Sequence, residues 1–464
     1  MKAFGVALGT NRLPIVGERV GAQPKVSRNG RFVLAQNGEV YNYKALAQAV
    51  AGTNSGEPAQ LSDTQVLADA IESFGVVEAL RRADWEGAFV AIDTTRRELI
   101  IARDHIGVKP LYVAAPSEDR IAVASELKAL VDARQGEVEE IAPGSVVTWS
   151  LGDLREKKVG RWPVPIVQRD GSPSASYVDE IDVKFRDAVA SRVPDEPYAV
   201  LFSGGLDSSL VLEYARSINP AVTAYILFRE GSPDLDVARR YCAESGVRLV
   251  EVEAPSPEAA TALIPYVIRV VESWEWHVIN HSVPMVPVFE QMARDGMRIV
   301  LTGEGADELF CGYREPAGTD PQQRRQDRVD NLHRTNCQRL DRISMSETIE
   351  CRVPFLSQSV ARAALEVPAS AQRDDTTTKR FLRAVARRRL PSYIVDRPKL
   401  SLARGVGYEY GTAGIFARDA GSGDRDYTSE AARFQVRYPI EESMVGEFLK
   451  LGYGRRRGAE FATV

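Results

Sequence analysis

The sequence lacks paired cysteines and has few histidines. Its four cysteines, Cys242, Cys311, Cys337 and Cys351, are widely spaced, and no two form a CxxC pair. Only four histidines occur among 464 residues, and neither residue type has the spacing of a zinc site. The pattern excludes a disulfide scaffold and a structural zinc domain, and it predicts free thiols in a reducing compartment.

Long hydrophobic runs and an excess of positive charge are also missing. No apolar run approaches the roughly 18 residues that a transmembrane helix requires, and residues 1–20 do not have the pattern of a secretory signal. The formal net charge is −5, and the arginine-rich stretches at 387–389 and 455–457 are short. We therefore expect a cytoplasmic protein that binds neither membranes nor nucleic acid.

What is present is the composition of a soluble globular protein, with 44% hydrophobic and 27% charged residues over a length that suggests two to three domains. Up to about Trp162, short strands alternate with turns, and one helical pattern covers about 63–82. This predicts a layered, antiparallel α+β domain over 1–163. Residues 164–176 are rich in Pro, Gly and Ser and are the predicted linker to a second domain over 177–464.

The second half of the chain has a different pattern of strand-like and helix-like segments. Apolar or β-branched runs alternate with segments of helical spacing, and beyond Gly305 the chain is mostly helical. The runs lie at 198–202, 222–228, 248–253 and 298–302. Such alternation predicts an α/β domain with a parallel sheet, in which ligands bind at the carboxyl ends of the strands.

A glycine-rich turn, Ser-Gly-Gly-Leu-Asp-Ser-Ser at 203–209, follows the first of these runs. Glycine permits a tight turn, and the helix that follows points free N–H groups into it. Serine hydroxyls add donors, so the turn suits a phosphate, and the carboxylate of Asp207 suits a Mg²⁺ ion bound to that phosphate. The turn has no lysine and is not a GxxxxGK[ST] P-loop; an ordinary glycine-rich turn is the alternative.

The last run leads into a second glycine-containing loop, Thr-Gly-Glu-Gly-Ala-Asp-Glu-Leu-Phe at 302–310. Asp207 and Asp307 would each stand at a strand end, where they could hold one Mg²⁺ between them. An acidic helix N-terminus explains the carboxylates of this loop as well when it is considered alone.

These stretches resemble known motifs. Residues 203–209 resemble the SGGxDS loop of the N-type ATP pyrophosphatases, and 303–313 are similar to the GEGADELFGGY motif of asparagine synthetases, with Cys311 in place of a glycine. Further stretches resemble the same family: Asp341–Met345 with Glu350–Leu356, Arg397–Lys399, and Gly405–Tyr408. The resemblance covers about 200–410 and implies a ligase that uses ATP and Mg²⁺ to adenylate a carboxylate, releasing pyrophosphate.

The resemblance also implies roles for individual residues. Glu304 would orient or deprotonate the incoming amine, and Lys399 would stabilise charge on phosphate and carbonyl oxygens, with a plain surface lysine as its alternative. The implied nucleotide and pyrophosphate contacts are Ser203, Gly204, Gly205, Asp207, Ser208, Ser209, Leu227 and Gly303, and the implied metal ligands are Asp207 and Asp307. The implied substrate or supporting contacts are Glu272, His281, Tyr313 and Glu350. Residues 272–281, which contain Trp274, Trp276, His277 and Asn280, differ from the family's ETYD…TIRAS-like stretch; they are an altered substrate wall or, alternatively, core aromatics.

The first half resembles the glutaminase domain of the same family, which has an Ntn-hydrolase fold. The resemblance rests on Gly21–Pro24, Asn37–Asn42, Ser62–Thr64, Glu86–Phe89, Arg103–Tyr112 and Ala124–Leu130. The working enzymes begin with a cysteine nucleophile, whereas in this chain Met1 and Lys2 stand in its place and no cysteine precedes Cys242. We therefore expect a degenerate domain, in which Asn37, Gly38, Glu39 and Asp63 are structural or bind another ligand.

The sequence is compatible with three functions. The first is an ATP-dependent amide-forming ligase that takes ammonia, another external amine, or nitrogen from a separate protein. The second is an intramolecular cyclase like the β-lactam synthetases, which carry a tyrosine in the role that the resemblance implies for Glu304; the retained Glu304 favours external amination. The third is a non-catalytic nucleotide-binding relic. A carrier protein and a homodimer are partners that the sequence leaves open.

Overall fold

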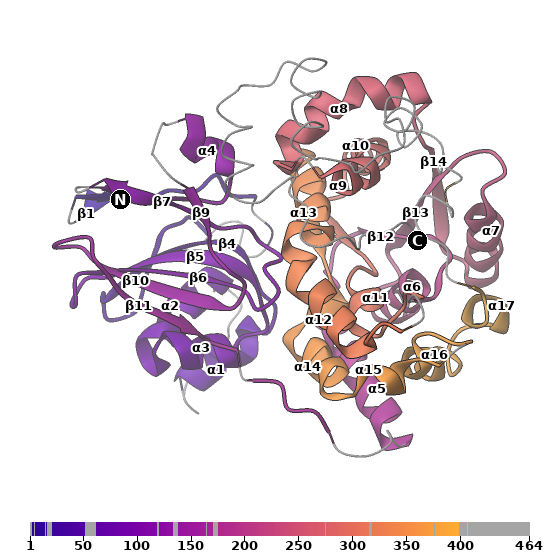
Figure 1. The fold of residues 1–464 in the computed structure, drawn as a ribbon, viewed down its shortest axis with the longest axis horizontal. Helices are drawn as coiled ribbons and strands as arrows, with labels where there is room; N and C mark the ends of the chain where they lie inside the picture. Colours follow the sequence, from indigo (N-terminus) through magenta and orange to yellow (C-terminus); the bar gives the residue numbers. More distant parts are fainter. Residues whose placement is uncertain are drawn as a thin grey trace. The chain divides into compact units, whose positions relative to one another are not determined.

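The structure is a computed structural model. It describes residues 2–3, 5–13, 15, 21–51, 62–117, 120–132, 138–163, 165–169, 175–273, 275–314, 318–374, 376–398 and 406. The chain divides into two compact units, Met1–Pro165 and Ile166–Val464, and Figure 1 shows the elements of each. The division falls inside the segment 164–176.

Unit 1 contains three antiparallel sheets and four short helices among its described residues. Its strands are β1 (Lys2–Ala3), β2 (Val6–Ala7), β3 (Lys25–Val26), β4 (Phe32–Val40), β5 (Trp85–Asp93), β6 (Glu98–Arg103), β7 (Tyr112–Ser117), β8 (Arg120–Ala124), β9 (Val138–Glu140), β10 (Ser145–Ser150) and β11 (Glu156–Arg161). Its helices are α1 (Tyr43–Ala51), α2 (Asp63–Phe74), α3 (Val76–Arg82) and α4 (Leu127–Asp132).

The main sheet of unit 1 has the order β11-β10-β6-β5-β4-β3 and buries both of its faces. On one face, Phe89 and Leu34 of the sheet pack with Leu67 and Leu80 of α2 and α3. On the other face, Ile101 packs in a core that includes residues of the smaller sheet β8-β7-β9. The predicted layered antiparallel domain is confirmed, with a helix–sheet–sheet arrangement.

The predicted continuous helix over 63–82 is wrong in one respect. It breaks at Gly75, which has φ 80° and separates α2 from α3. This backbone conformation is open to glycine and disfavoured for other residues. The apolar residues therefore keep their helical spacing in the sequence, although the helix itself is interrupted at this glycine.

Unit 2 contains one parallel sheet enclosed by helices among its described residues. Its strands are β12 (Tyr198–Leu201), β13 (Val222–Phe228), β14 (Arg248–Glu253), β15 (Ile299–Leu301) and β16 (Glu350–Arg352). Its α-helices are α5 (Ala175–Arg192), α6 (Leu206–Ile218), α7 (Pro233–Ser245), α8 (Pro257–Val271), α9 (Trp276–Ser282), α10 (Val286–Arg294), α11 (Ala306–Leu309), α12 (Pro321–Asn331), α13 (Asn336–Ser346), α14 (Gln358–Glu366), α15 (Ala369–Gln372), α16 (Arg380–Ala386) and α17 (Ser392–Val395). Short 3₁₀ turns are η2 (Val283–Met285), η3 (Leu332–Arg334) and η4 (Pro354–Leu356).

The parallel sheet has the order β14-β13-β12-β15-β16, and the four predicted strands are confirmed. β13 and β15 consist of apolar or β-branched residues that are mostly buried, as expected for a sheet covered on both faces. The chain runs from β12 outward to β14 and then returns to place β15 on the other side of β12. The loops after β12 and β15 therefore flank the switch point of the sheet, where open α/β sheets bind ligands.

The segment between the units is partly ordered against unit 2. The guanidinium of Arg169 donates to Glu180 on α5 and to Glu366 on α14, at 2.7 Å each. Helix α5 begins at Ala175, so the last two residues of the predicted linker are helical; residues 170–174 lie outside the described part of the chain.

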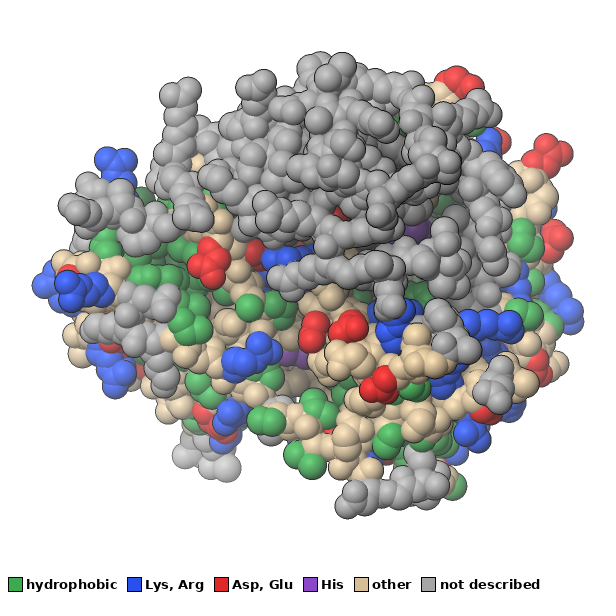
Figure 2. Space-filling model, viewed as in Figure 1, with side chains coloured by type: hydrophobic (Ala, Val, Ile, Leu, Met, Phe, Trp, Pro, Cys, Tyr) green, Lys and Arg blue, Asp and Glu red, His purple; other side chains and the backbone are tan. Residues whose placement is uncertain are grey.

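The structure bears on two features that the sequence excludes, a disulfide scaffold and a membrane-spanning helix. All four cysteines are buried, and none of them forms a disulfide bond. No helix in the described ranges is long and apolar enough to cross a membrane. Figure 2 shows acidic and basic side chains on the same face of the molecule, among hydrophobic and uncharged ones.

Candidate active site

The loop after β12 is shaped by two glycines. Gly204 has φ 68°, and a Cβ atom there would lie 3.1 Å from Val237 and 3.3 Å from the amide of Ala238. Gly205 is the N-cap of α6 and provides no side-chain cap. The first N–H groups of α6 are therefore left for a ligand, as at other phosphate-binding helix N-termini.

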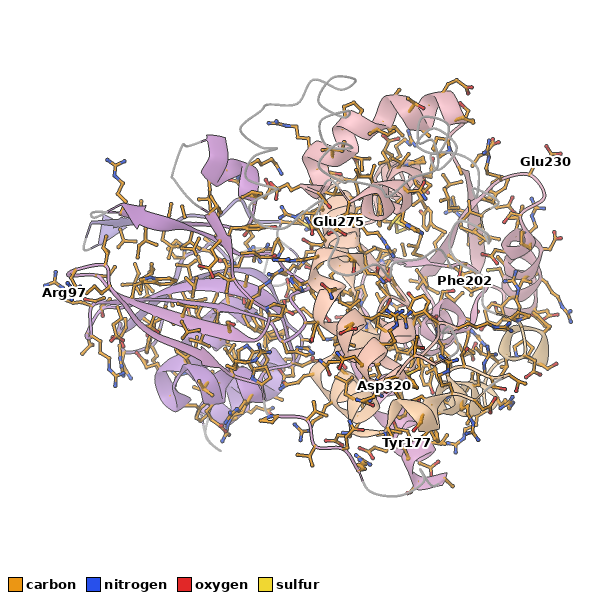
Figure 3. All side chains as sticks on the ribbon, viewed as in Figure 1. Arg97, Tyr177, Phe202, Glu230, Glu275 and Asp320 are labelled. Atoms are coloured by element: carbon orange, nitrogen blue, oxygen red, sulfur yellow. The ribbon has the colours of Figure 1, made fainter. Side chains whose placement is uncertain are left out.

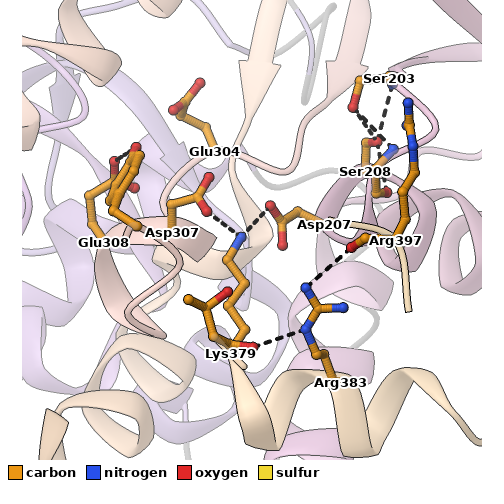
Figure 4. A network of polar contacts seen from close by, with 12 residues as sticks. Ser203, Asp207, Ser208, Glu304, Asp307, Glu308, Lys379, Arg383 and Arg397 are labelled. Atoms are coloured by element: carbon orange, nitrogen blue, oxygen red, sulfur yellow. Dashed lines mark hydrogen bonds and ion pairs between the residues drawn. The ribbon is translucent and has the colours of Figure 1, made fainter. Parts of the chain in front are cut away.

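The three serines of this loop differ in position. The hydroxyls of Ser203 and Ser208 lie 3.1 Å apart, and Ser208 Oγ also accepts from the Ser203 amide at 3.1 Å (Figure 4). Ser203 lines the pocket described below. Ser209 has no exposed surface, and within the described residues its hydroxyl makes no hydrogen bond. Ser203 and Ser208 thus form the polar side of the turn, whereas Ser209 lies on the buried face of α6.

The loop after β15 packs directly on the first loop. A Cβ atom on Gly303 would lie 2.9 Å from Asp207 Cβ and 2.9 Å from the Ser208 amide nitrogen. Any side chain at this position would push the two loops apart. The two motifs, about a hundred residues apart in sequence, therefore form one site at the carboxyl edge of the sheet.

The ammonium group of Lys379 lies between the two carboxylates that were predicted to share a metal. Its Nζ is 2.6 Å from Asp207 and 2.5 Å from Asp307, and its side chain is 3% exposed (Figure 4). Gly312 leaves room for this arrangement, since a Cβ atom there would lie 2.0 Å from Asp307 Oδ1 and 2.2 Å from Lys379 Cε. Asp207 and Asp307 converge, and a lysine that the sequence did not reveal holds them.

These carboxylates suit a Mg²⁺ ion by their chemistry. They are hard oxygen donors from two different loops, and Mg²⁺ in nucleotide sites takes one or two carboxylates together with phosphate oxygens. Lys379 shows that a cation is already stabilised at this place. Within the described ranges, no three His, Cys, Asp or Glu side chains gather as a complete metal site would require, so the remaining ligands would have to come from the nucleotide and water.

A pocket opens beside the first loop. Its lining residues are Ser203, Gly205, Leu206, Asp207, Asp234, Thr378, Lys379, Arg383, Arg397 and Pro398. Arg397 pairs with Asp234 at 2.7 Å, and Arg383 donates to the Thr378 carbonyl at 2.9 Å. Burial lowers the pKa of Arg383. Three positive side chains, Lys379, Arg383 and Arg397, thus line the same pocket as the serine loop, which favours an anionic ligand.

The predicted residue Lys399 lies outside the described part of the chain. Its two preceding residues, Arg397 and Pro398, line the pocket. Val406 of the following motif accepts a hydrogen bond from the Arg229 amide at 3.1 Å, one residue beyond the end of β13. The predicted adenine contact Leu227 is a buried residue of the same strand end. Residues 397–398 and 406 therefore border the same edge of the sheet as the two loops.

A cluster of acidic and aromatic side chains extends from the second loop. Tyr313 donates its hydroxyl hydrogen to Glu308 Oε1 at 2.6 Å. Burial, together with the charges of Asp307 and Glu304, raises the pKa of Glu308 to about 7. Burial, followed by the charge of Glu308, also raises the pKa of Tyr313. The predicted catalytic Glu304 lies at the edge of this cluster, with its side chain 20% exposed.

The residues of the predicted substrate wall lie in different surroundings. Glu272 is fully buried and pairs with Arg342 at 2.8 Å, so its carboxylate holds α8 to α13 and forms no exposed wall. Glu275, labelled in Figure 3, directly precedes α9, and burial raises its pKa to about 7. Glu350 pairs with Arg352 at 2.6 Å inside the sheet. Trp274 and the side chains of Trp276 and His277 are outside the described set, whereas Asn280 is buried and His281 is partly exposed.

The residues of the predicted glutamine site lie in unit 1. Asn37, Gly38 and Glu39 lie on β4, and a Cβ atom on Gly38 would lie 2.1 Å from the Glu86 carbonyl oxygen, so this glycine permits close strand pairing. Asp63 Oδ2 accepts hydrogen bonds from Gln36 Nε2 at 2.5 Å and from the Val40 amide at 3.3 Å. Through these contacts Asp63, at the start of α2, is joined to β4.

Known proteins resemble both halves of the chain. A family model described as a glutamine amidotransferase domain matches residues 1–150, and one described as asparagine synthase matches 180–326 and 314–438. Asparagine synthetase [glutamine-hydrolyzing] 3 of Arabidopsis thaliana is 31% identical over 431 residues, which are 87% of this chain and 72% of the relative. The probable asparagine synthetase of Dictyostelium discoideum is 30% identical over 436 residues, 86% of this chain and 77% of the relative. Asparagine synthetase B of Escherichia coli strain K12 is 28% identical over 452 residues, 93% of this chain and 80% of the relative.

Proposed function

The chain belongs to the asparagine synthetase family, and on that premise we propose that it adenylates a substrate carboxylate with ATP and couples the acyl group to ammonia or another external amine. Its relatives identify it as an asparagine synthetase-like, ATP-dependent ligase. The formation of AMP, the identity of the acid and the use of an external amine are the content of the proposal.

One observation carries the proposal. The loops after β12 and β15 pack against each other at Gly303, and their carboxylates Asp207 and Asp307 converge on one cation. The pocket beside them combines the uncapped N-terminus of α6 with the positive side chains of Lys379, Arg383 and Arg397. This combination suits a nucleotide triphosphate at the switch point of a parallel sheet.

In the proposed reaction, a substrate carboxylate oxygen attacks the α-phosphorus of ATP, the bond to the β-phosphate oxygen breaks, and pyrophosphate leaves. The N–H groups of α6 and the Ser203 hydroxyl would bind the departing phosphates, and Lys379 would face them once it leaves the carboxylates. The amine nitrogen then attacks the activated carbonyl carbon, Glu304 accepts its proton, and the carbon–oxygen bond to AMP breaks. Lys399 would stabilise the negative charge that develops in both steps.

Asp207 and Asp307 would hold a Mg²⁺ ion in the loaded enzyme. When bound, such an ion neutralises charge on the phosphate oxygens. Because Lys379 already pairs with both carboxylates, the ammonium group would move as the nucleotide arrives.

We also propose that the first unit has no glutaminase activity. All four cysteines belong to unit 2, so unit 1 has no thiol that could attack a glutamine amide. The contacts of Asp63 with Gln36 and Val40 support a structural role for the former glutamine-binding residues. Glutamine hydrolysis by the full chain should therefore be no faster than in buffer, and a measurable turnover would refute this part of the proposal.

The decisive experiment measures AMP and pyrophosphate from Mg-ATP with a panel of carboxylic acids that includes L-aspartate, each with and without ammonia or hydroxylamine. AMP release that depends on the amine, with an amide or hydroxamate as product, would support the proposal and identify the acid. AMP release without an amine, with a product one water lighter than the acid, would replace it by an internal cyclase. No AMP with any acid, together with retained ATP binding, would favour a nucleotide-binding relic.

A further inference from the structure

The carboxamide of Asn336 lies between two glutamates of the second loop. Asn336 Nδ2 donates to Glu304 Oε1 at 2.7 Å and to Glu308 Oε1 at 2.9 Å. An asparagine NH₂ group has two hydrogens, and in this site both are directed at carboxylates. Asn336 is the first residue of α13, so this contact joins that helix to the loop after β15.

A second residue of α13 contacts the same glutamate. Arg339 Nη2 lies 3.4 Å from each carboxylate oxygen of Glu304. Residues three apart in a helix lie on the same face, so Asn336 and Arg339 form one surface against Glu304. The side chain of Glu304 nevertheless keeps 20% of its surface exposed, whereas the residue Glu308 is 5% exposed. Of the two glutamates, Glu304 is the one that a substrate amine can reach.

The two acid pairs of the site are held in different ways. Asp207 and Asp307 share the charged ammonium of Lys379. Glu304 and Glu308 share the neutral amide of Asn336, and Glu304 alone of the two also has the ion pair with Arg339 at 3.4 Å. Without this bridge, two acidic side chains would face each other and repel, and the position of Glu304 would depend on its longer contact with Arg339.

We infer that Asn336 is a positioning residue for the amine-transfer step. It fixes one carboxylate oxygen of Glu304 through a hydrogen bond of 2.7 Å, whereas the other oxygen has the longer contact with Arg339 at 3.4 Å and would accept the proton of the incoming amine. This inference rests on the proposed function, in which Glu304 accepts the proton of the amine. Asn336 itself need not touch the substrate.

The test separates the two half-reactions in the full chain. Asn336→Leu keeps the length and the branching of the side chain and removes both donors. With the acid identified by the panel, ATP–pyrophosphate exchange reports adenylation, and hydroxamate formation with hydroxylamine reports transfer. We expect exchange within about threefold of wild type and a fall in kcat for transfer of about 10²-fold, the usual contribution of a positioned general base, with a smaller change in KM for hydroxylamine.

A matched control and a second variant distinguish the proposed effect on transfer from a simple loss of structure. Asn331 lies near the end of α12 and donates to the Asp327 carbonyl at 2.6 Å; Asn331→Leu should leave both half-reactions unchanged. Asn336→Ser shortens the side chain and, like Asn336→Leu, should affect transfer alone. Equal losses in exchange and transfer, in both Asn336 variants, would show a structural role and overturn the inference.

A double-mutant cycle tests whether Asn336 acts through Glu304. In a Glu304→Gln background, the added Asn336→Leu change should alter the transfer rate by less than about twofold, because coupled residues are not additive. Additive losses would refute the inference, and so would wild-type transfer in Asn336→Leu; in both cases the proposed ligase activity would still stand. If the wild type adenylates no acid, the proposed function fails first, and this inference falls with it.

Discussion

The ion pairs of Lys379 allow a quantitative prediction about stability. Lys379→Met keeps an unbranched side chain and removes the charge between Asp207 and Asp307. The lysine side chain is 3% exposed and each aspartate side chain is 13% exposed, so solvent screens these charges only in part. We expect the variant to be clearly less stable than wild type at neutral pH.

The size of the effect follows from the geometry. The two carboxylate oxygens lie within 2.6 Å of the same nitrogen, so they are at most about 5 Å apart, and at an effective dielectric constant of about 20 their repulsion is about 3 kcal/mol. Removing one partner from a buried pair typically costs about 3–5 kcal/mol. For a unit of this size, such a loss lowers the melting temperature by about 10 °C.

Thermal unfolding of the full chain, with and without Mg²⁺ and in the absence of nucleotide, tests this prediction. Mg²⁺ alone should raise the melting temperature of Lys379→Met, because the metal takes the place of the ammonium, and should leave wild type nearly unchanged. Lys184→Met is a matched control, since Lys184 is 35% exposed and lies 3.7 Å from Glu180. An unchanged melting temperature in Lys379→Met, or equal stabilisation of wild type by Mg²⁺, would refute the argument.

Three further predictions concern single residues. Gly312→Ala should lower stability and nucleotide affinity, because its Cβ would lie 2.0 Å from Asp307 Oδ1; thermal unfolding and ATP titration measure both, and a variant equal to wild type contradicts the packing argument. Glu275 has a pKa raised to about 7 by burial, so the stability of wild type relative to Glu275→Gln should fall as pH rises from 5 to 8, by about 2 kcal/mol; a difference independent of pH would contradict it. All four cysteines are buried and burial raises the pKa of Cys242 to about 12, so a thiol reagent should label them only after denaturation; labelling of the native chain would show otherwise.

The sequence predicted the central part of the second unit well. The runs at 198–202 and 222–228 are apolar and lead into turns, and the structure forms strands there with nearly the same bounds. The convergence of Asp207 and Asp307 also followed from the pattern, because both follow parallel strands whose carboxyl ends meet at one edge. The local sequence pattern and the parallel topology of the sheet were together sufficient to predict that these two aspartates lie at one edge of the site.

Lys379 could not be found in the same way. It is 172 residues from Asp207 in sequence, and its residue has φ 55°, which a lysine rarely adopts. The stretch Thr376-Thr377-Thr378-Lys379 has no motif that marks an ion pair. Its position depends on where α16 packs, which is a long-range property of the fold.

Strand β16 was missed for a related reason. It has three residues, and two of them, Glu350 and Arg352, are charged. Such a segment does not look like a buried strand, since isolated buried charges are costly. In the structure the two side chains pair with each other at 2.6 Å. Because each charge has a partner, this polar segment can form the fifth strand of the sheet.

The two units differ in how their polar residues are held, and this difference bears on function. In unit 2, the carboxylates of Asp207 and Asp307 are joined by the terminal group of a long side chain, and Lys379 can move aside when a ligand brings other charges. In unit 1, the carboxylate of Asp63 accepts one hydrogen bond from Gln36 and one from the backbone amide of Val40, which has a fixed position in β4. At the first site a ligand cation can replace the ammonium group, whereas a ligand at Asp63 would have to displace the two hydrogen bonds that its carboxylate accepts. This asymmetry agrees with the proposed catalysis in unit 2 and with a structural role for the predicted glutamine-site residues.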